Sequence, residues 1–180
     1  MRIGVSGTHG TGKTTLIEDV CARLPGHGSV EEPYLLLEEE GHLFGHPPSP
    51  DDYRVQLRRS LLLLRSPAER IVFDRTPVDF LAYLAAYGHD VEEEADPDVL
   101  ESAMASLDLL VVLPITAETE RFLPEADLPR LRQTVNDALL GLVHDDPLGA
   151  WSDLPILEAT GPLERRTEAV LAAAARLDRP

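Results

Sequence analysis

The fold of this chain is decided by Ser6-Gly7-Thr8-His9-Gly10-Thr11-Gly12-Lys13-Thr14-Thr15-Leu16. Residues 2–6 just before it are expected to form a strand, and apolar residues at helical spacing predict a helix from Lys13 to about Leu24. Glycines let the connecting backbone curl into a nest of inward-pointing amides, the geometry that binds phosphate groups. The spacing of the glycines and the lysine is that of a P-loop, which binds nucleotides.

Each part of this loop has an expected role in binding ATP and Mg²⁺. The residues expected to bind ATP here are Thr8, His9, Gly10, Thr11, Gly12, Lys13, Thr14 and Thr15. Lys13 is expected to reach the outer phosphates, and the hydroxyl of Thr14 to hold Mg²⁺. The helix that begins near Lys13 adds the positive end of its dipole. His9 is not required by the motif, and we interpret it as a spacer with an exposed backbone amide.

The usage of cationic residues supports this interpretation. Of 16 cationic residues, 15 are arginine and one is lysine, and that lysine is Lys13. A lysine placed at random would fall on this position about once in 180 tries. GTPase switches read guanine with an Asn-Lys-x-Asp motif, which would need a second lysine. A conventional GTPase is therefore not expected.

Length, charge and cysteine usage set further bounds. At 180 residues the chain is expected to form one domain, residues 1–180. The net charge of −16 repels nucleic acid polymers, and the acidic runs at 38–40 and 92–94 are interpreted as solvated surface. No apolar run approaches the ~18 residues of a membrane span, and a strand at 2–6 leaves no room for a signal peptide. The lone Cys21 cannot form an intramolecular disulfide, so we expect a buried thiol and a reducing cytoplasm.

Apolar periodicity and turn residues divide the rest of the chain into alternating strands and helices. Strands are expected at residues 2–6, 28–32, 71–73, 109–113 and 156–158. Helices are expected at residues 13–24, 51–64, 76–88, 97–107, 128–143 and 163–177. Residues 33–49 give no clear pattern, and residues 121–129 resemble a charged connection. This alternation predicts a parallel sheet covered by helices, with 109–113 as a central strand.

The strand expected at 71–73 ends at Asp74-Arg75. Mechanical ATPases commonly follow a strand-end aspartate with a glutamate that polarises water. Arginine cannot act as a base, but it can bind a substrate or stabilise a transferring phosphoryl group. Asp74 terminates a buried strand beside the expected loop, so we favour a functional role over helix capping.

Two stretches carry a family resemblance. The first is the loop itself, and the second is Phe73-Asp74-Arg75-Thr76-Pro77-Val78-Asp79-Phe80-Leu81-Ala82-Tyr83-Leu84. Together they resemble P-loop small-molecule kinases of the AAA-type ATPase and ribosylnicotinamide kinase-like group, and more distantly deoxynucleoside and thymidylate kinases. The resemblance implies an α/β, three-layer P-loop NTPase fold. It further implies a five-stranded parallel sheet with the loop strand central and a small helical lid at about residues 116–132.

The resemblance also implies roles for three strand-end residues. Asp74 resembles the acid that supports magnesium or the acceptor, and Arg75 resembles the arginine that contacts phosphate or substrate. Glu32 lies in a Glu-Pro pair like that of deoxynucleoside kinases, where the glutamate accepts the proton of the acceptor hydroxyl. The adjacent Glu31 stays an alternative base, and an ordinary surface acid is the alternative for Glu32.

Residues around the adenine are implied in the same way. Arg121 lies where such kinases begin their lid, and it is expected to stack on adenine or clamp phosphates. Arg130 and Arg132 are the other lid candidates, with ordinary surface arginine as the alternative for each. The turn Thr160-Gly161-Pro162 resembles the turn that borders adenine, and a plain strand-to-helix turn is the alternative.

The acceptor side is less defined. Gln56, Arg58 and Arg59 are candidates for the acceptor pocket, although the two arginines point in different directions on a helix. Tyr83 and Tyr87 are expected to pack in the core or at its rim. Two departures from the family leave the acceptor open. The lid lacks an arginine-rich run, and Glu32-Pro33 is followed by Tyr and three Leu instead of the tryptophan pattern.

The function expected from these features is phosphoryl transfer from ATP, with Mg²⁺, to a small hydroxyl acceptor such as a nucleoside, nucleotide or related metabolite. The expected catalytic residues are Lys13, Glu32, Asp74, Arg75 and Arg121, and Thr14 and Asp74 are the expected metal ligands. Two alternatives stay open: an ATP-hydrolysing regulatory or partner-binding protein, and a structural nucleotide-binding protein. The sequence does not define the oligomeric state.

Overall fold

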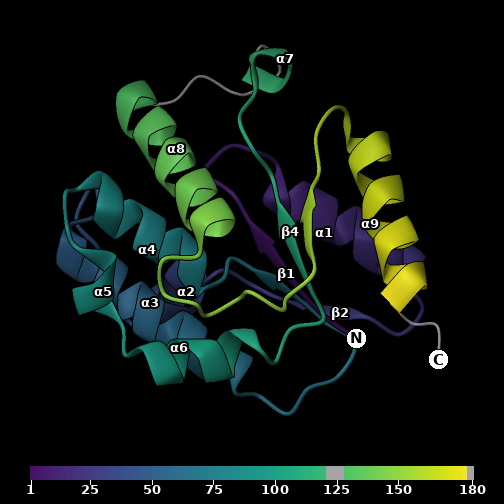
Figure 1. Cartoon of the computed structure of the whole chain (residues 1–180), viewed down its shortest axis with the longest axis horizontal. Coiled ribbons are helices and arrows are strands. Elements are labelled where there is room, and N and C mark those ends of the chain that lie inside the picture. The colour runs from purple at the N-terminus through teal and green to yellow at the C-terminus, as the bar shows by residue number, and fades with distance from the viewer. Residues whose placement is uncertain (121–127, 178–180) are drawn as a thin grey trace.

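A computed structural model describes residues 1–120 and 128–177, in which strands and helices alternate (Figure 1). The strands are β1 (Arg2–Ser6), β2 (Gly28–Val30), β3 (Ile71–Asp74), β4 (Leu109–Val112) and β5 (Ile156–Glu158). The helices of the described ranges are α1 (Lys13–Arg23), α2 (Pro33–Glu39), α3 (Pro50–Leu64), α4 (Pro77–Ala86), α5 (Val91–Glu94), α6 (Pro97–Met104), α7 (Ala117–Glu120), α8 (Pro129–Asp145) and α9 (Leu163–Leu177).

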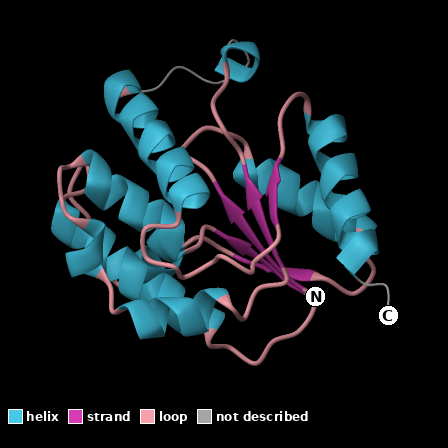
Figure 2. Cartoon of the chain, in the orientation of Figure 1, coloured by secondary structure: helices cyan, strands magenta, loops and turns pink. Residues whose placement is uncertain are grey.

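The strands form one five-stranded parallel sheet with the order β2-β3-β1-β4-β5 (Figure 2). The strand before the P-loop, β1, is central, as expected. Its register pairs Val5 with Asp74 of β3 and Ser6 with Val112 of β4. The end of β1, where the P-loop begins, therefore lies directly beside the end of β3, and the predicted fold class is confirmed.

Helices cover both faces of the sheet and make three layers. The helices α1 and α9 pack together on one face, and α3, α4, α6 and α8 cover the other (Figure 1). The strand β4 contributes to both layers, because Leu110 and Val112 join one apolar cluster while Leu109 and Val111 join the other. A strand buried on both faces reads as a continuous apolar run, which is why this segment was predictable from its composition.

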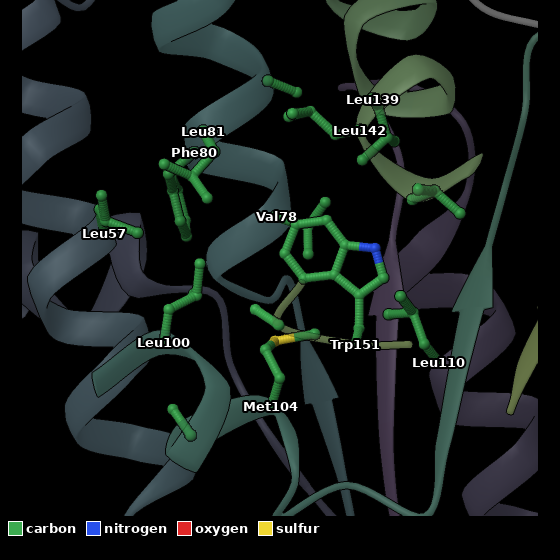
Figure 3. Packing of buried hydrophobic residues seen from close by; sticks show 14 of the residues in the cluster. Leu57, Val78, Phe80, Leu81, Leu100, Met104, Leu110, Leu139, Leu142 and Trp151 are labelled. Carbon is green, nitrogen blue, oxygen red and sulfur yellow. The ribbon is translucent and has the colours of Figure 1, made fainter. Parts of the chain in front are cut away.

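The larger apolar cluster lies under α4 and α8, on the side that also carries α3 and α6. In Figure 3, Trp151 lies among Val78, Met104 and Leu110, and Leu139 approaches from α8. This cluster holds α4 in place, and α4 begins three residues after the end of β3.

Four elements differ from the sequence expectation. The helix α2 lies in residues 33–49, which gave no pattern, because Pro33 is its one fully buried residue and its leucines form no buried stripe. The short helices α5 and α7 were not expected, and α6 ends at Met104, three residues before its predicted end.

Cys21 is half-buried instead of fully buried, and burial raises the pKa of its thiol. Among the described residues, no helix has the length and apolar character needed to cross a membrane.

Arg2 lies at the start of β1, at the opposite end of this strand from the P-loop, and contacts several segments of the chain there. Its guanidinium lies over the ring of Phe73, 5.0 Å from the centroid, and burial lowers its pKa despite the opposing charge of Asp108. It donates hydrogen bonds of 2.5–2.9 Å to the backbone carbonyls of Leu64, Ala68, Ser66 and Ser106. One side chain thus satisfies carbonyl groups at the end of α3, in the loop before β3 and in the segment that follows α6.

We expect Arg2→Met to lower the free energy of unfolding by about 2–4 kcal/mol, because four partly buried carbonyl groups lose their donor. Denaturant unfolding followed by circular dichroism measures this change. The matched control is Arg23→Met, which removes half-exposed ion pairs with Asp19 and Glu164 and should cost under ~1 kcal/mol. Equal losses in the two variants would contradict the role given to Arg2.

Candidate active site

The P-loop connects β1 to α1 and closes into a compact nest. Gly10 and Gly12 have φ angles of 76° and 81°, in the left-handed region that side chains with a Cβ rarely adopt. The hydroxyl of Thr11 donates to the carbonyl of Thr8 at 2.8 Å, and the Lys13 ammonium donates to the same carbonyl at 3.1 Å. The loop predicted from the sequence therefore has the conformation that its glycines were expected to allow.

Lys13 is buried beneath this loop, with 6% of its surface exposed. Burial, together with the nearby charge of Arg75, lowers the pKa of Lys13 from an ordinary 10.5 to about 8. The carboxylates of Asp79, Asp74 and Glu32 act in the opposite direction. Lys13 is consequently protonated at neutral pH but loses its proton far more easily than a surface lysine.

Asp79 ties the P-loop to α4. One carboxylate oxygen accepts a hydrogen bond from the Gly7 amide at 2.9 Å, and the other accepts from the Thr76 amide at 2.9 Å. The side chain is almost completely buried. The sequence had indicated the helix start at Thr76 but not the contact with Gly7, which lies 72 residues away. Asp79 is thus a positioning residue for the loop that sequence reasoning missed.

Arg166 of α9 holds the loop from its other end. Its guanidinium donates to the carbonyl of Thr11 at 2.8 Å, and burial lowers its pKa. The same guanidinium lies 3.4 Å from the position that a Cβ on Gly12 would occupy. No local signal could have indicated this contact, because Thr11 and Arg166 are 155 residues apart.

The predicted adenine-side turn lies directly before α9. Gly161 has a φ of 90°, and the Arg166 amide donates to the carbonyl of Pro162 at 3.1 Å. The turn Thr160-Gly161-Pro162 is therefore one helical turn from the residue that contacts the P-loop. Its role toward adenine stays a prediction.

Thr14, in the first turn of α1, contacts Asp74, the last residue of β3. The Thr14 hydroxyl donates to one oxygen of Asp74 at 2.8 Å. The other oxygen, Oδ1, is buried and has no hydrogen-bond partner among the described residues. Burial raises the pKa of Asp74, while Lys13, Arg75 and Thr14 oppose that rise. A buried carboxylate oxygen that lacks a donor fits a cation, and oxygen donors are those that Mg²⁺ prefers.

The protein offers only part of such a coordination sphere. Within residues 1–120 and 128–177, no group of three His, Cys, Asp or Glu side chains is arranged to hold a metal ion. Mg²⁺ is commonly bound by one or two protein oxygens together with phosphates and water. The pair formed by Thr14 and Asp74 fits that pattern.

Glu32 and Arg75 form an ion pair beside the loop. The Arg75 Nε donates to Glu32 at 2.5 Å, and its Nη1 donates to the carbonyl of Gly7 at 3.2 Å. Burial alone would raise the pKa of Glu32, but the charge and hydrogen bond of Arg75 outweigh it and the pKa is lowered. Glu31, the alternative base, is exposed to solvent. The structure thus brings Glu32 to the loop and leaves Glu31 outside.

Arg75 is held in an unusual conformation. Its φ of 73° lies in the left-handed region, which costs a non-glycine residue conformational energy. Its amide donates to the carbonyl of Val5 at 2.9 Å, and 9% of its side chain is exposed. The backbone bends here so that the guanidinium turns back over the loop, toward Gly7 and Glu32.

A cavity of about 270 Å³ opens next to this ion pair. Its lining includes His9, Glu32, Tyr53, Gln56, Arg75 and Tyr83. The rings of Tyr53 and Tyr83 stack with centroids 4.4 Å apart and an angle of 10° between their planes. The structure therefore places the side chain of His9 at the cavity, a position that the sequence did not indicate, and its interpretation as a spacer stays a prediction.

The other acceptor-side candidates separate in the structure. Gln56 is buried and lines the cavity, whereas Arg58 is exposed and Arg59 pairs with Glu40. The two arginines are thus not brought to the cavity, as their different directions on α3 had suggested. Tyr87 is 38% exposed at the rim, as expected.

The lid region is described in part. Arg121 lies outside the described residues, which include 116–120 and 128–132 of this region. Arg130 is exposed and Arg132 is buried in the first turns of α8. The side-chain oxygen of Asn136 accepts a hydrogen bond from the backbone amide of Ile115 at 2.7 Å. This bond connects the segment just before the lid region to α8. Lid roles for Arg121, Arg130 and Arg132 stay predictions.

Solved structures resemble this chain over nearly its whole length. NadR protein in complex with NR matches with a TM-score of 0.67 and 22% identity, covering 99% of this chain and 52% of the NadR chain. This chain thus spans about half the length of NadR. Deoxyadenosine kinase from M. mycoides matches with a TM-score of 0.65 and 16% identity, covering 99% of this chain and 100% of that chain.

Thymidylate kinase from Candida albicans matches with a TM-score of 0.61 and 14% identity, covering 97% of this chain and 91% of that chain. At these identities the likeness shows the fold. A search of curated protein sequences gives no match. The family described as AAA domain matches residues 2–146. Because this match covers most of the chain, the protein belongs to the AAA domain family, and its fold is that of the P-loop kinases.

Proposed function

We propose that the protein is a kinase that transfers the outer phosphoryl group of ATP to a small hydroxyl acceptor, a nucleoside, nucleotide or related metabolite. One observation carries this proposal. Three neighbouring strands end beside one cavity. The P-loop follows β1, the pair Asp74-Arg75 lies at the end of β3, and Glu32 follows β2. A phosphate site, a carboxylate and a space for a second small molecule thus lie together.

The donor half uses the P-loop. Its amides and Lys13 bind the outer phosphates of ATP, and Thr14 and Asp74 hold Mg²⁺. Mg²⁺ bound there neutralises charge on the phosphates. We propose that Arg121 and the turn at Thr160-Gly161-Pro162 border the adenine. A NadR structure in complex with NAD and AMP-PNP supports the assignment of ATP by analogy of fold.

The acceptor half uses Glu32 and Arg75. The acceptor hydroxyl oxygen forms a bond to the outer phosphorus, the bond from that phosphorus to the leaving oxygen of ADP breaks, and Glu32 takes the hydroxyl proton. Arg75 orients Glu32 through their 2.5 Å hydrogen bond and adds positive charge beside the transferring group. With its pKa lowered, Glu32 is ionised at neutral pH, the form that a proton acceptor needs.

An ATP-hydrolysing protein without a small acceptor is the competing hypothesis. It would need a group that activates water, and Arg75 follows Asp74 where such ATPases carry a glutamate. The cavity beside Glu32 has no purpose in that hypothesis.

We place the kinase in a reducing cytoplasm, where the single thiol of Cys21 stays unpaired.

The test is a screen of nucleosides, ribosylnicotinamide and sugars with magnesium-ATP, beside a reaction without acceptor. We expect ADP formation to depend on an acceptor, and Glu32→Gln to lower kcat by ~100-fold or more because the proton acceptor is lost. The matched control is Glu31→Gln on the exposed neighbour, which should retain activity. Hydrolysis that no acceptor changes would overturn the proposal, and equal losses in both variants would remove Glu32 as the base.

The pKa of Lys13 predicts how ATP binding depends on pH. Below about pH 8 Lys13 already carries its proton, so binding to phosphate requires no proton uptake. Above that pH the bound phosphates draw a proton onto Lys13, and ATP affinity should fall by up to about tenfold per pH unit. Calorimetry in two buffers of different ionisation heat measures the proton uptake.

We expect this uptake to be near zero at neutral pH and to approach one proton well above pH 8. The control is Lys13→Arg, whose guanidinium stays protonated throughout and should show no uptake. Uptake that is the same in both proteins would place the titrating group elsewhere.

A further inference from the structure

The cavity beside the Glu32–Arg75 ion pair has a chemistry that restricts the acceptor. This step rests on the proposed function, because it treats the cavity as the acceptor site. The volume of about 270 Å³ suits a small molecule of limited size. Two features of its wall, its aromatic surface and its charge, decide which small molecules fit.

Aromatic side chains form much of the wall, from Tyr34, Tyr53, Phe80 and Tyr83. The ring of Tyr83 has two close neighbours: Tyr53 stacks on it, and the Arg75 guanidinium lies 5.7 Å from its centroid. Tyr53 and Tyr83 are 6% and 5% exposed, and the parts of the rings that line the cavity can pack against another aromatic ring. A sugar without such a ring would lose this aromatic packing.

The charge of the site opposes a second phosphate. Among the described residues that line the cavity, Arg75 is the one with a permanent positive charge. It is already paired with Glu32 at 2.5 Å and approaches Asp79 at 3.5 Å. Among the described residues that line the cavity, the positive charge of Arg75 is therefore already balanced by the negative charge of Glu32. A phosphate monoester would bring further negative charge beside Glu32 and beside the phosphates of ATP.

Arginines of α3 do not supply the missing positive charge. Arg54 is paired with Glu94 at 2.5 Å and with Asp51 at 2.8 Å. Arg59 is paired with Glu40. These ion pairs lie away from the cavity, whose lining from α3 is Tyr53 and Gln56.

We infer that the acceptor is an unphosphorylated alcohol that carries an aromatic ring, of the nucleoside class, and that phosphate monoesters of the same ring system are rejected. The ring lies against the tyrosine wall, and the hydroxyl group lies at Glu32. The assignment selects nucleosides over nucleotides and over sugars, three classes that the fold alone leaves equal.

The experiment measures binding apart from turnover. Calorimetry with the wild-type protein, magnesium and a non-hydrolysable ATP analogue compares the binding of nucleosides, of their 5′-monophosphates and of ribose at one fixed pH. We expect each bound nucleoside to bind ~100-fold or more tightly than its monophosphate, from like-charge repulsion, and ribose not to bind. A monophosphate or ribose that binds as tightly as the nucleosides would overturn the inference, as would a panel with no binding.

Variants separate the two features of the wall. Tyr83→Leu should weaken nucleoside binding by ~5-fold or more, whereas Tyr87→Leu, on the exposed tyrosine at the rim, should leave it unchanged. Glu32→Gln should reduce the ratio of nucleoside affinity to monophosphate affinity by about tenfold, because one negative charge is removed. A ratio that Glu32→Gln leaves unchanged would contradict the electrostatic cause. Nucleosides that bind selectively but are never phosphorylated would refute the kinase proposal and leave the ligand class standing.

Discussion

The carboxylate of Asp79 is the contact on which the site depends. It lies inside the protein, where an unpaired charge is costly, and it accepts backbone hydrogen bonds from both Gly7 and Thr76. Gly7 begins the P-loop, and Thr76 is the N-cap residue of α4, which carries Phe80 and Tyr83 of the cavity wall. One side chain therefore fixes the P-loop and the wall of the neighbouring cavity relative to each other.

The parallel sheet places the reactive groups on neighbouring strands. Because β2, β3 and β1 are adjacent and parallel, their carboxyl ends meet at one edge. Burial and the charges gathered there shift the pKa values of these groups: Arg75 lowers that of Glu32 against the effect of burial, burial together with Arg75 lowers that of Lys13, and burial raises that of Asp74. Such opposed shifts in one cluster are typical of catalytic sites, and here they accompany a strained Arg75 and an unpartnered Asp74 oxygen.

Features with a local signal were predictable from the sequence. The P-loop, β4 and the helix after Thr76 each combine a spacing rule with a turn or cap, and the structure confirms them. Contacts between distant segments were not predictable. Hydrogen bonds join Gly7 to Asp79 and Arg166 to Thr11, residues that are 72 and 155 positions apart, and no periodicity in the sequence encodes them. The helix α2 was missed because its leucines share no buried face, and the choice of Glu32 over Glu31 required the position of Arg75.

The central claim is that donor and acceptor sites act together, so that the outer phosphoryl group of ATP passes to a small molecule. Phosphorus NMR of a single turnover, with excess protein over magnesium-ATP and a saturating nucleoside, follows that group directly. The account predicts one phosphate ester on the nucleoside for each ADP formed. Inorganic phosphate in place of the ester, in the same amount as ADP, would contradict it.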